Sequence, residues 1–481
     1  MYKELKNKKC FIFPYSASSN ILKTELEQNN VIILGFIDNK IQNSNILLLN
    51  EAIKQNFDYI IIYSDNHLVE IYKQTVQVVD KHKILSATLS SQNNFILNNT
   101  YKVLQIKDEK EQKINNYFLQ KQKEYTLSNS ILLIGIGFID INIKYLYEYI
   151  KKYTKYNVYL ATNNKRDIEK FNEYNIKVVE YYSKDFIDLV FQCKIKIVDH
   201  SPVEPMLVKV LQIGCVIQLW HGVTVKMLGT QVDYKIIDYD IVLSTSQFVT
   251  DYSFSKLYNY KHIIHCGYPR NDILRFDDIE LINVDLKLLN QMQNDSNKYI
   301  IYMPTYRPLG FENNPFDYKR LNEFGKKHNI KFIIKMHPFI GEKIRDDLNS
   351  HKHFDYSFTH LIIYDASMDI YPLLKYSDML IADYSSVYFD YLFVDKPIVF
   401  FPYDYEAWQE SADGTMLDYF SYTPGDIYYD FDKLLEGILK NLDNDQYKLD
   451  RKNLLNKMFI NQTYKSSQLI IQKIEELLFD I

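Results

Sequence analysis

One segment of the chain combines residue types that could do acid–base chemistry on a bound ligand: residues 218–226 read QLWHGVTVK. The apolar run before it, 214–217, predicts a buried strand, so His221 should lie where that strand ends. The carboxyl ends of strands in a parallel sheet face the ligand crevice. A histidine there can exchange protons near neutral pH, Gly222 lets a ligand approach the backbone, and Lys226 adds positive charge. The alternative is a packed Trp-His pair at a strand end, which is the commoner explanation of such a motif when it stands alone.

Polar residues also follow predicted strands in the last third of the chain. The strands and the residues after them are 299–303 with Thr305 and Arg307, 331–336 with His337, and 379–382 with Asp383, Ser385 and Ser386. Packing does not require polar groups repeatedly at one edge of a sheet, so this recurrence favours a binding site. Arg307 could clamp phosphate oxygens, and the amides of a helix that begins near Ser385 could bind an anion. The alternatives are a surface charge at Arg307 and ordinary capping of the helix by Asp383 or Ser385.

These motifs lie on elements that alternate between strand and helix along the 481 residues, which predicts parallel sheets in an α/β fold. The length suggests about three domains. The expected segments are a Rossmann-like domain at 1–110, a charged linker at 111–129, and doubly wound domains at 130–266 and 267–481. The last two would face each other across a cleft, with His221 on one wall and His337, Arg307 and Ser385 on the other. This is the arrangement of the GT-B class of glycosyltransferases.

The individual elements follow from apolar runs and helical periodicity. The predicted strands are 10–14, 31–37, 59–63, 131–137, 158–160, 195–198, 214–217, 241–246, 299–303, 331–336, 379–382 and 398–401, and the predicted helices include 20–29 and 144–152. The linker is rich in Lys, Glu and Gln, which indicates a solvated helix or an extended connection.

The first domain has a loop, 14–20, where a dinucleotide-binding loop would lie, and Asp38 ends its second strand as a ribose-binding acid would. The loop contains no glycine, although the dinucleotide fingerprint depends on glycines for close approach to the pyrophosphate. We therefore expect the loop to be structural. The domain resembles the Rossmann-like domains attached to bacterial sugar transferases, and this resemblance assigns it no activity.

Composition excludes several classes of function. The net charge of −5 provides no overall basic field for nucleic acid. The chain has no predicted signal peptide and no stretch near the roughly 18 apolar residues of a spanning helix, so we expect a cytoplasmic protein. No acidic cluster indicates a metal site, and no cofactor is predicted. The four cysteines are scattered without a C-x-x-C pair, which indicates neither zinc nor disulfides: Cys10, Cys193, Cys215 and Cys266.

Five motifs together resemble those of the CDP-glycerol glycerophosphotransferase family, the teichoic-acid and capsule polymerases and primases. They occur in the order QLWHG at 218–222 with Lys226, GYPRND at 267–272, MPTYR at 303–307, KMHP at 335–338 and DYSSVYFD at 383–390. Each motif alone is modest, but their correct order over about residues 130–450 makes the resemblance strong.

The resemblance implies a transferase that moves a polyol phosphate, most commonly glycerol phosphate, from a CDP-activated donor to a hydroxyl of a growing polymer and releases CMP. It implies that His221 is the general base and that His337 binds the donor pyrophosphate and supports departure of CMP. The donor-binding positions that it implies are Arg307, Thr305, Asp383, Ser385, Ser386, Lys226 and Arg270.

Two other functions fit the same pattern. A GT-B glycosyltransferase would use a nucleotide-sugar donor and release a nucleoside diphosphate in most cases. A binding protein could recognise a nucleotide or a partner through its first domain while the remainder is inactive, although the intact pair His221 and His337 argues against this.

The family's acceptors are lipid-linked or polymeric, so we expect peripheral contact with the cytoplasmic face of the membrane. The candidate contact is 144–155, where lysines alternate with tyrosines that could lie among lipid headgroups. Its lysines are Lys144, Lys151, Lys152 and Lys155. The alternative is an ordinary amphipathic helix packed on the second sheet.

Overall fold

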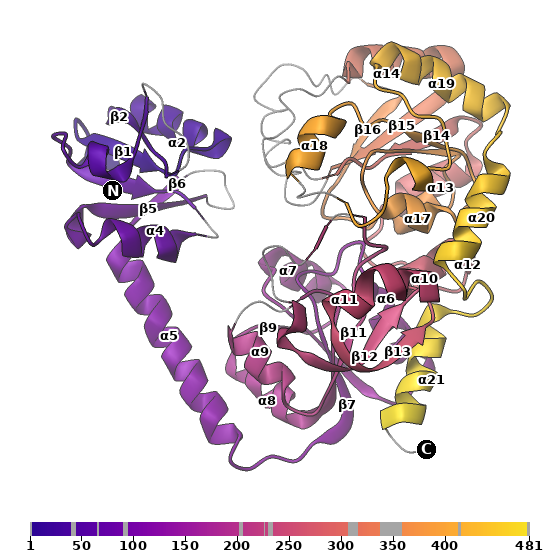
Figure 1. The fold of residues 1–481 in the computed structure, drawn as a ribbon, viewed down its shortest axis with the longest axis horizontal. Coiled ribbons are helices and arrows are strands. Elements are labelled where there is room, and N and C mark those ends of the chain that lie inside the picture. The colour runs from indigo at the N-terminus through magenta and orange to yellow at the C-terminus, as the bar shows by residue number, and fades with distance from the viewer. Residues whose placement is uncertain are drawn as a thin grey trace. The chain divides into compact units, whose positions relative to one another are not determined.

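The computed structural model describes residues 2–39, 45–64, 67–89, 95–201, 205–225, 227–228, 234–305, 316–336, 358–411 and 415–478. Within these ranges the chain forms two compact units, one built by its N-terminal 116 residues and one by residues from Tyr117 on (Figure 1). The first unit contains one six-stranded sheet, and the second contains a seven-stranded and a five-stranded sheet. The predicted α/β class is confirmed.

The first unit is a doubly wound sheet with strand order β3-β2-β1-β4-β5-β6, parallel except that β6 runs antiparallel to β5. Its strands are β1 (Lys9–Phe13), β2 (Ile32–Ile37), β3 (Ile46–Leu47), β4 (Tyr59–Ile62), β5 (Ile84–Leu89) and β6 (Phe95–Asn99). Its α-helices are α1 (Tyr2–Leu5), α2 (Ala17–Gln28), α3 (Leu49–Ala52) and α4 (Leu68–Thr75). Ser16 and Ser19 form a capping box that starts α2, so the glycine-free loop has a structural role.

Helix α5 (Thr100–Lys121) covers most of the predicted charged linker. Its last turns are not solvated as expected. Phe118 is buried against Phe191 with ring centroids 5.1 Å apart, and the hydroxyl of Tyr117 donates to Asp188 at 2.9 Å. The end of α5 therefore belongs to the packed part of the second unit.

The second sheet is entirely parallel, with order β13-β12-β11-β10-β7-β8-β9. Its strands are β7 (Ser128–Ile134), β8 (Asn157–Thr162), β9 (Val178–Glu180), β10 (Cys193–Val198), β11 (Cys215–Gln218), β12 (Asp238–Ser244) and β13 (Asn259–His265). The α-helices between them are α6 (Asn142–Tyr153), α7 (Lys165–Glu173), α8 (Lys184–Gln192), α9 (Pro205–Leu211), α10 (Gln247–Val249) and α11 (Ser255–Leu257). Strands of a parallel sheet are covered on both faces, which explains their nearly continuous apolar runs.

The third sheet has the parallel order β16-β15-β14-β17-β18. Its strands are β14 (Lys298–Tyr302), β15 (Ile330–Lys335), β16 (Leu361–Tyr364), β17 (Met379–Ala382) and β18 (Ile398–Phe400). The accompanying α-helices are α12 (Asp272–Arg275), α13 (Leu286–Asn294), α14 (Tyr318–His328), α16 (Tyr371–Leu374), α17 (Val387–Tyr391), α18 (Tyr405–Ser411), α19 (Phe431–Asp443) and α20 (Lys448–Met458). Strand order reverses between β14 and β17, which is where ligands bind in such sheets.

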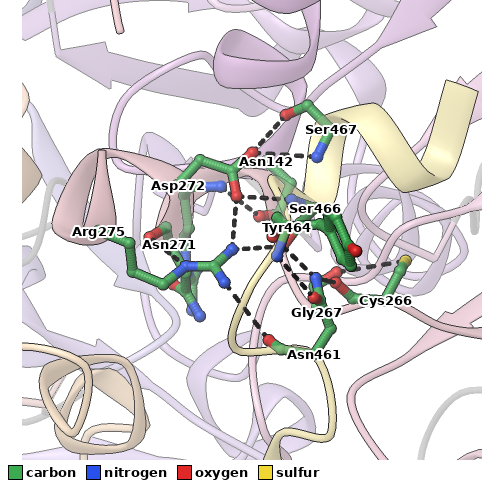
Figure 2. Close-up of polar contacts among 11 residues, drawn as sticks. Asn142, Cys266, Gly267, Asn271, Asp272, Arg275, Asn461, Tyr464, Ser466 and Ser467 are labelled. Carbon is green, nitrogen blue, oxygen red and sulfur yellow. Dashed lines mark hydrogen bonds and ion pairs between the residues drawn. The ribbon is translucent and has the colours of Figure 1, made fainter. Parts of the chain in front are cut away.

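The last helix, α21 (Ser466–Leu478), packs on the second sheet rather than the third. Ile470, Ile471 and Ile474 are buried in the same apolar cluster as Ile131 and Leu133 of β7. Figure 2 shows how its first residues are held. The carboxylate of Asp272 accepts hydrogen bonds from the amides of Ser466 and Ser467 at 2.7 and 3.0 Å, and from the Ser467 hydroxyl at 2.8 Å.

Helix α6 corrects the prediction of a membrane surface at 144–155. Lys144 is only 1% exposed, and its ammonium donates to the carbonyl of Ile282 at 2.6 Å and to the carboxylate of Asp369 at 2.5 Å. Tyr145 is buried as well and donates to Asp369 at 2.8 Å. The packed amphipathic helix is therefore the correct interpretation of the first half of this segment, whereas Lys151, Lys152 and Lys155 at its end are exposed.

Candidate active site

The turn after β11 carries His221 at the carboxyl edge of the second sheet. Its start is fixed by Leu219, whose amide donates to the carbonyl of Val198 at 2.7 Å, and by Gln218, whose side chain accepts from the amide of Trp220 at 2.9 Å. Trp220 then takes a φ of +57°, a left-handed conformation that is unusual for a bulky residue. Such backbone strain persists only where surrounding contacts fix it, and it concentrates at functional sites.

The imidazole of His221 is oriented by two neighbours. Its Nδ1 lies 2.9 Å from the backbone carbonyl of Asp199, and its ring centroid lies 4.0 Å from that of Trp220. A carbonyl oxygen can only accept, so Nδ1 carries the proton and Nε2 is the basic nitrogen of the neutral ring. This is the tautomer that a general base requires.

The surroundings of His221 also favour the neutral ring. Burial of the imidazole among protein atoms lowers the pKa of His221 below its ordinary value of 6.5, and the positive charge of Arg270 lowers it further. The hydrogen bond to Asp199 and the charge of Asp199 partly oppose this decrease. His221 is nevertheless exposed to solvent along part of its surface. His221 is therefore an accessible base that is unprotonated at neutral pH.

Gly222 lies directly against Arg270 and against Ser386, the residue that precedes α17. A methyl group added at its Cα would lie 2.9 Å from the hydroxyl of Ser386 and 2.9 Å from Nη2 of Arg270, and its φ is +143°. Only glycine accommodates this conformation and this approach. The His221 turn and the residue that precedes α17 are thus in contact.

We expect Gly222→Ala to damage both stability and activity. The new methyl group forces the backbone out of its present φ and pushes the turn away from Ser386, at a cost of about 1–3 kcal/mol. Thermal unfolding and the rate of CMP release from a CDP-polyol would measure the two effects. An unchanged melting temperature together with an unchanged rate would show that the turn has room that the structure does not give it.

Thr305 and Asp383 meet at the point where the strand order of the third sheet reverses. The amide of Thr305 donates to both carboxylate oxygens of Asp383 at 3.0 Å, and its hydroxyl donates to one of them at 2.6 Å. Asp383 is fully buried and joins the ends of β14 and β17. Its side chain does not cap the helix that follows, contrary to one of the predicted alternatives.

Ser385 and Ser386 lie between Asp383 and α17, which is a helix of only five residues. Ser386 occupies the N-cap position without a side-chain cap hydrogen bond, and the hydroxyl of Ser385 accepts from the amide of Val387 at the long distance of 3.5 Å. The helix that was predicted to begin near Ser385 therefore begins at Val387. Both serines follow the carboxyl end of β17, and Ser386 lies beside the His221 turn.

Three predicted site residues, His337, Arg307 and Lys226, lie outside the described residues. The described residues next to them have partners far away in the sequence. Thr305 is bound to Asp383, the carbonyl of Val225 accepts from the amide of Met416 at 2.8 Å, and Lys335 ends β15 with its ammonium 2.6 Å from Asp140.

Arg270 lies beneath the His221 turn and is only 5% exposed. Its Nη1 donates to the carbonyl of His221 at 2.8 Å, and its Nη2 donates to the carboxylate of Asp390 on α17 at 2.6 Å. The predicted role of Arg270 in donor binding stays a prediction, but both terminal nitrogens already have partners within the protein.

A cluster of buried charges between α6 and the third sheet was not predicted from the sequence. Asp369 binds Lys144, Lys144 lies 3.8 Å from Glu148, and Asp140 pairs with Lys335. The spacing of four between Lys144 and Glu148 puts them on one helix face. That spacing indicates a pair, but a sequence does not show that the pair is buried.

The ionisation of this cluster departs from that of exposed groups. Burial opposes the charge on Lys144, but the negative charges of Asp369, Glu148 and Asp140 together outweigh it, so the pKa of Lys144 is raised. Burial raises the pKa of Glu148 to about 8, although Lys144 partly offsets this. Burial also raises the pKa of Asp140 to about 6 against the opposing effect of Lys335. Neither oxygen of Glu148 has a hydrogen-bond partner among the described residues.

The described residues contain no group of three or more His, Cys, Asp or Glu side chains placed to hold a metal ion. The chemistry that the described site can perform is proton transfer at Nε2 of His221, next to a carboxyl edge lined by hydroxyls and backbone amides.

A family model described as CDP-Glycerol:Poly(glycerophosphate) glycerophosphotransferase matches residues 115–476, and a model described as C2185-like, N-terminal, matches residues 6–85. The teichoic acid poly(glycerol phosphate) polymerase of Bacillus subtilis (strain 168) is 27% identical over 335 residues, which are 64% of this chain and 43% of that protein. The teichoic acid glycerol-phosphate primase of Bacillus spizizenii is 29% identical over 355 residues, 68% of this chain and 87% of the primase.

Among solved structures, the wall teichoic acid polymerase TagF superimposes with a TM-score of 0.60 at 21% identity, and the match covers 79% of this chain and 97% of that chain. This likeness confirms the predicted GT-B-like fold. The match to the Bacillus subtilis polymerase spans less than half of that relative's length.

Proposed function

Because the chain belongs to the CDP-glycerol:poly(glycerophosphate) glycerophosphotransferase family, we propose that it transfers a polyol phosphate, in the first place glycerol phosphate, from a CDP-activated donor to a hydroxyl of a growing capsule or teichoic-acid-like polymer. The observation that carries the proposal is His221, held with Nδ1 on the Asp199 carbonyl and Nε2 basic, in contact with the segment that carries Ser386. A TagF variant has been solved after soaking with a molecule abbreviated CDPG, which supports the choice of donor.

The reaction is a displacement at phosphorus. The acceptor oxygen forms a bond to the phosphorus that carries the polyol, the bond from that phosphorus to the bridging oxygen breaks, and CMP leaves with that oxygen. The acceptor proton passes to Nε2 of His221. Phosphoryl transfer depends mainly on positioning and charge stabilisation, and a well-placed base contributes about 10²–10⁴-fold.

We assign the donor to the carboxyl edge of the third sheet. Its diphosphate would be bound by Arg307, His337 and Lys226, with Ser385 and Ser386 supplying hydroxyls and amides. His337 would also stabilise the departing CMP. Thr305 and Asp383, joined across the reversal of strand order, support this edge, which is the place where open α/β sheets bind ligands.

Incubating the protein with CDP-glycerol, CDP-ribitol and several nucleotide sugars would test the proposal directly. We expect release of CMP from a CDP-polyol and transfer of the polyol phosphate to an acceptor. Release of a nucleoside diphosphate from a nucleotide sugar instead would make the protein a GT-B glycosyltransferase. Inertness toward every donor would favour the binding protein with an inactive enzyme fold.

Two substitutions on the donor side are expected to differ in strength. Arg307→Ala should weaken binding of CDP-glycerol more than the double change Ser385→Ala with Ser386→Ala, since a lost charged two-point contact exceeds a lost hydroxyl while the backbone amides survive. Calorimetric titration would measure both affinities. Arg320→Ala is the matched control, because Arg320 is an exposed arginine of α14 that pairs with Asp432. Unchanged affinity in both test variants would place the donor elsewhere.

The acceptors proposed here are lipid-linked or polymeric, so we infer peripheral contact with the cytoplasmic face of the cell membrane. None of the described helices is both long and apolar enough to cross a bilayer. The exposed lysines at the end of α6, Lys151, Lys152 and Lys155, are the part of the predicted contact that stays available and could interact with anionic headgroups.

A further inference from the structure

Two backbone carbonyls of the His221 turn are held by side chains from outside the turn. Nδ2 of Asn142, at the start of α6, donates to the carbonyl of Trp220 at 2.6 Å. Nη1 of Arg270 donates to the carbonyl of His221 at 2.8 Å. These contacts hold the peptide groups on both sides of His221, where Trp220 has its left-handed backbone and Gly222 its φ of +143°. A strained turn of this kind keeps its shape only when its surroundings determine it.

The two holding residues are themselves connected. Oδ1 of Asn142 accepts from the backbone amide of Arg270 at 3.3 Å, so one buried amide side chain binds both the turn and the segment that carries the arginine. Asn142 is fully buried. Its two ends therefore fix the distance between the Trp220 carbonyl and Arg270.

Arg270 also connects the turn to helix α17, which follows the third sheet's strand β17. Nη2 donates to Oδ2 of Asp390 at 2.6 Å, and the hydroxyl of Tyr371 donates to the same oxygen at 2.7 Å. Asp390 is fully buried on α17, the short helix that follows Ser385 and Ser386. The ring of Tyr371 also lies 5.3 Å from the guanidinium.

We propose that Asn142, Arg270 and Asp390 form a positioning unit that holds the His221 turn in its reactive geometry and fixes it to the helix beside the donor. This role rests on the proposed function, because it assigns the unit to the reaction in which His221 is the base. The three are positioning residues, since they act through the backbone of the turn. In this arrangement both terminal nitrogens of the Arg270 guanidinium point to groups of the protein, the His221 carbonyl and the Asp390 carboxylate.

A donor-binding arginine and a positioning arginine predict different kinetic changes. Loss of a donor contact raises KM for the donor, whereas loss of the support under His221 lowers kcat with little change in KM. The charge of Arg270 also lowers the pKa of His221, after the larger effect of burial. Asp199 and His200 are the other ionisable groups that act on His221, and they stay in place when Arg270 is changed.

The test compares Arg270→Gln, Asp390→Asn and Asn142→Ala with the wild-type protein. We expect kcat for CMP release to fall roughly 10- to 100-fold in each variant, because misplacement of a catalytic group by about 1 Å has effects of this size, while KM for CDP-glycerol changes less than about threefold. In Arg270→Gln the acidic limb of the pH profile of kcat/KM should also move to higher pH, since the lost positive charge raises the pKa of His221.

Arg275→Gln is the matched control. Arg275 is a buried arginine five residues further on that pairs with Asp272 at 2.8 Å and donates to the Ser466 hydroxyl at 3.1 Å, as Figure 2 shows. Its hydrogen-bond partners, Asn271, Asp272, Asn461 and Ser466, lie around α12 and before or at the start of α21, and not in the His221 turn. We expect this variant to lose stability but to keep kcat and the pH profile of the wild type.

A second measurement does not depend on turnover. Nuclear magnetic resonance titration of protein labelled at histidine, with the His221 signal assigned by its loss in His221→Gln, reports the pKa of His221 directly. A higher pKa in Arg270→Gln, with no shift in Arg275→Gln, supports the unit even if every CDP-polyol proves inert, in which case only the proposed reaction fails. A raised KM with unchanged kcat and an unchanged His221 titration overturns the positioning role and makes Arg270 a donor ligand.

Arg270→Lys covers the case in which Arg270→Gln does not fold. Lysine keeps the positive charge but cannot hold Asp390 and the His221 carbonyl in the same two-point geometry. We expect a lowered kcat with an unshifted His221 pKa. Full activity of a folded Arg270→Lys protein would contradict the proposal, because charge alone would then be sufficient.

Discussion

Replacing His221 with alanine is expected to slow CMP release at least about 100-fold, because a general base contributes about 10²–10⁴-fold to such a reaction. The geometry gives the reason. Nδ1 is committed to the carbonyl of Asp199, which leaves Nε2 to take the proton of the acceptor hydroxyl. Affinity for CDP-glycerol, measured by calorimetry, should stay close to that of the wild type, since the base acts on the acceptor.

The pH profile sharpens this expectation. The neutral ring is the active form, so kcat/KM should rise with pH through the pKa of His221, which lies below 6.5, and should be level above it. His262→Ala is a suitable control, because His262 is an exposed histidine of β13 in the same sheet. If His221→Ala keeps more than about a tenth of the turnover, the general-base assignment is wrong.

Replacing Asp369 with asparagine is expected to lower the free energy of unfolding by about 3–5 kcal/mol, because it leaves the buried ammonium of Lys144 without its counter-charge. Asp369 also accepts from the hydroxyl of Tyr145 at 2.8 Å and from the amide of Tyr371 at 2.9 Å. Denaturant unfolding at neutral pH would measure the loss. A change below about 1 kcal/mol, the size expected of an exposed pair, would show that the cluster is hydrated.

Glu148→Gln is the matched control in the same cluster and should act differently. The folded-state pKa of Glu148 is about 8 against an ordinary 4.5, so the folded protein binds the extra proton between these values. The contribution of Glu148 to stability is therefore complete below pH 4.5 and is lost as the pH rises through 8. Glutamine removes this loss, so the variant should be more stable than the wild type at pH 8.5 and nearly equal to it at pH 4.5.

Much of the site could be predicted because strand ends are visible in a sequence. Apolar runs such as 214–217 and 379–382 locate buried strands, and the polar residues directly after them must lie at the carboxyl edge. This reasoning correctly placed His221, Thr305 and Asp383 at the ends of β11, β14 and β17. The alternation of strand and helix likewise predicted parallel sheets, but not strand β6, which runs antiparallel to β5.

The remaining features depend on contacts between residues far apart in the chain. Lysine is usually a surface residue, and the burial of Lys144 is explained by Asp369, 225 positions away, together with the carbonyl of Ile282. Asp383 was predicted as a possible helix cap, but its carboxylate accepts hydrogen bonds from Thr305 instead. The left-handed backbone of Trp220 follows from contacts with Asn142 and Gln218. Local patterns carry no signal for such pairings.

The return of α21 to the second sheet affects how this protein is made on the ribosome. Ile470, Ile471 and Ile474 complete an apolar cluster whose strands end at His265, and about 200 residues are synthesised between them. At a translation rate of about 5–20 residues per second, roughly 10 to 40 seconds pass between the synthesis of the second sheet and that of α21, which covers it. During that interval its uncovered isoleucines and leucines are exposed to chaperones and to neighbouring nascent chains, so the yield of folded protein depends on the cell's capacity to protect the unfinished second sheet.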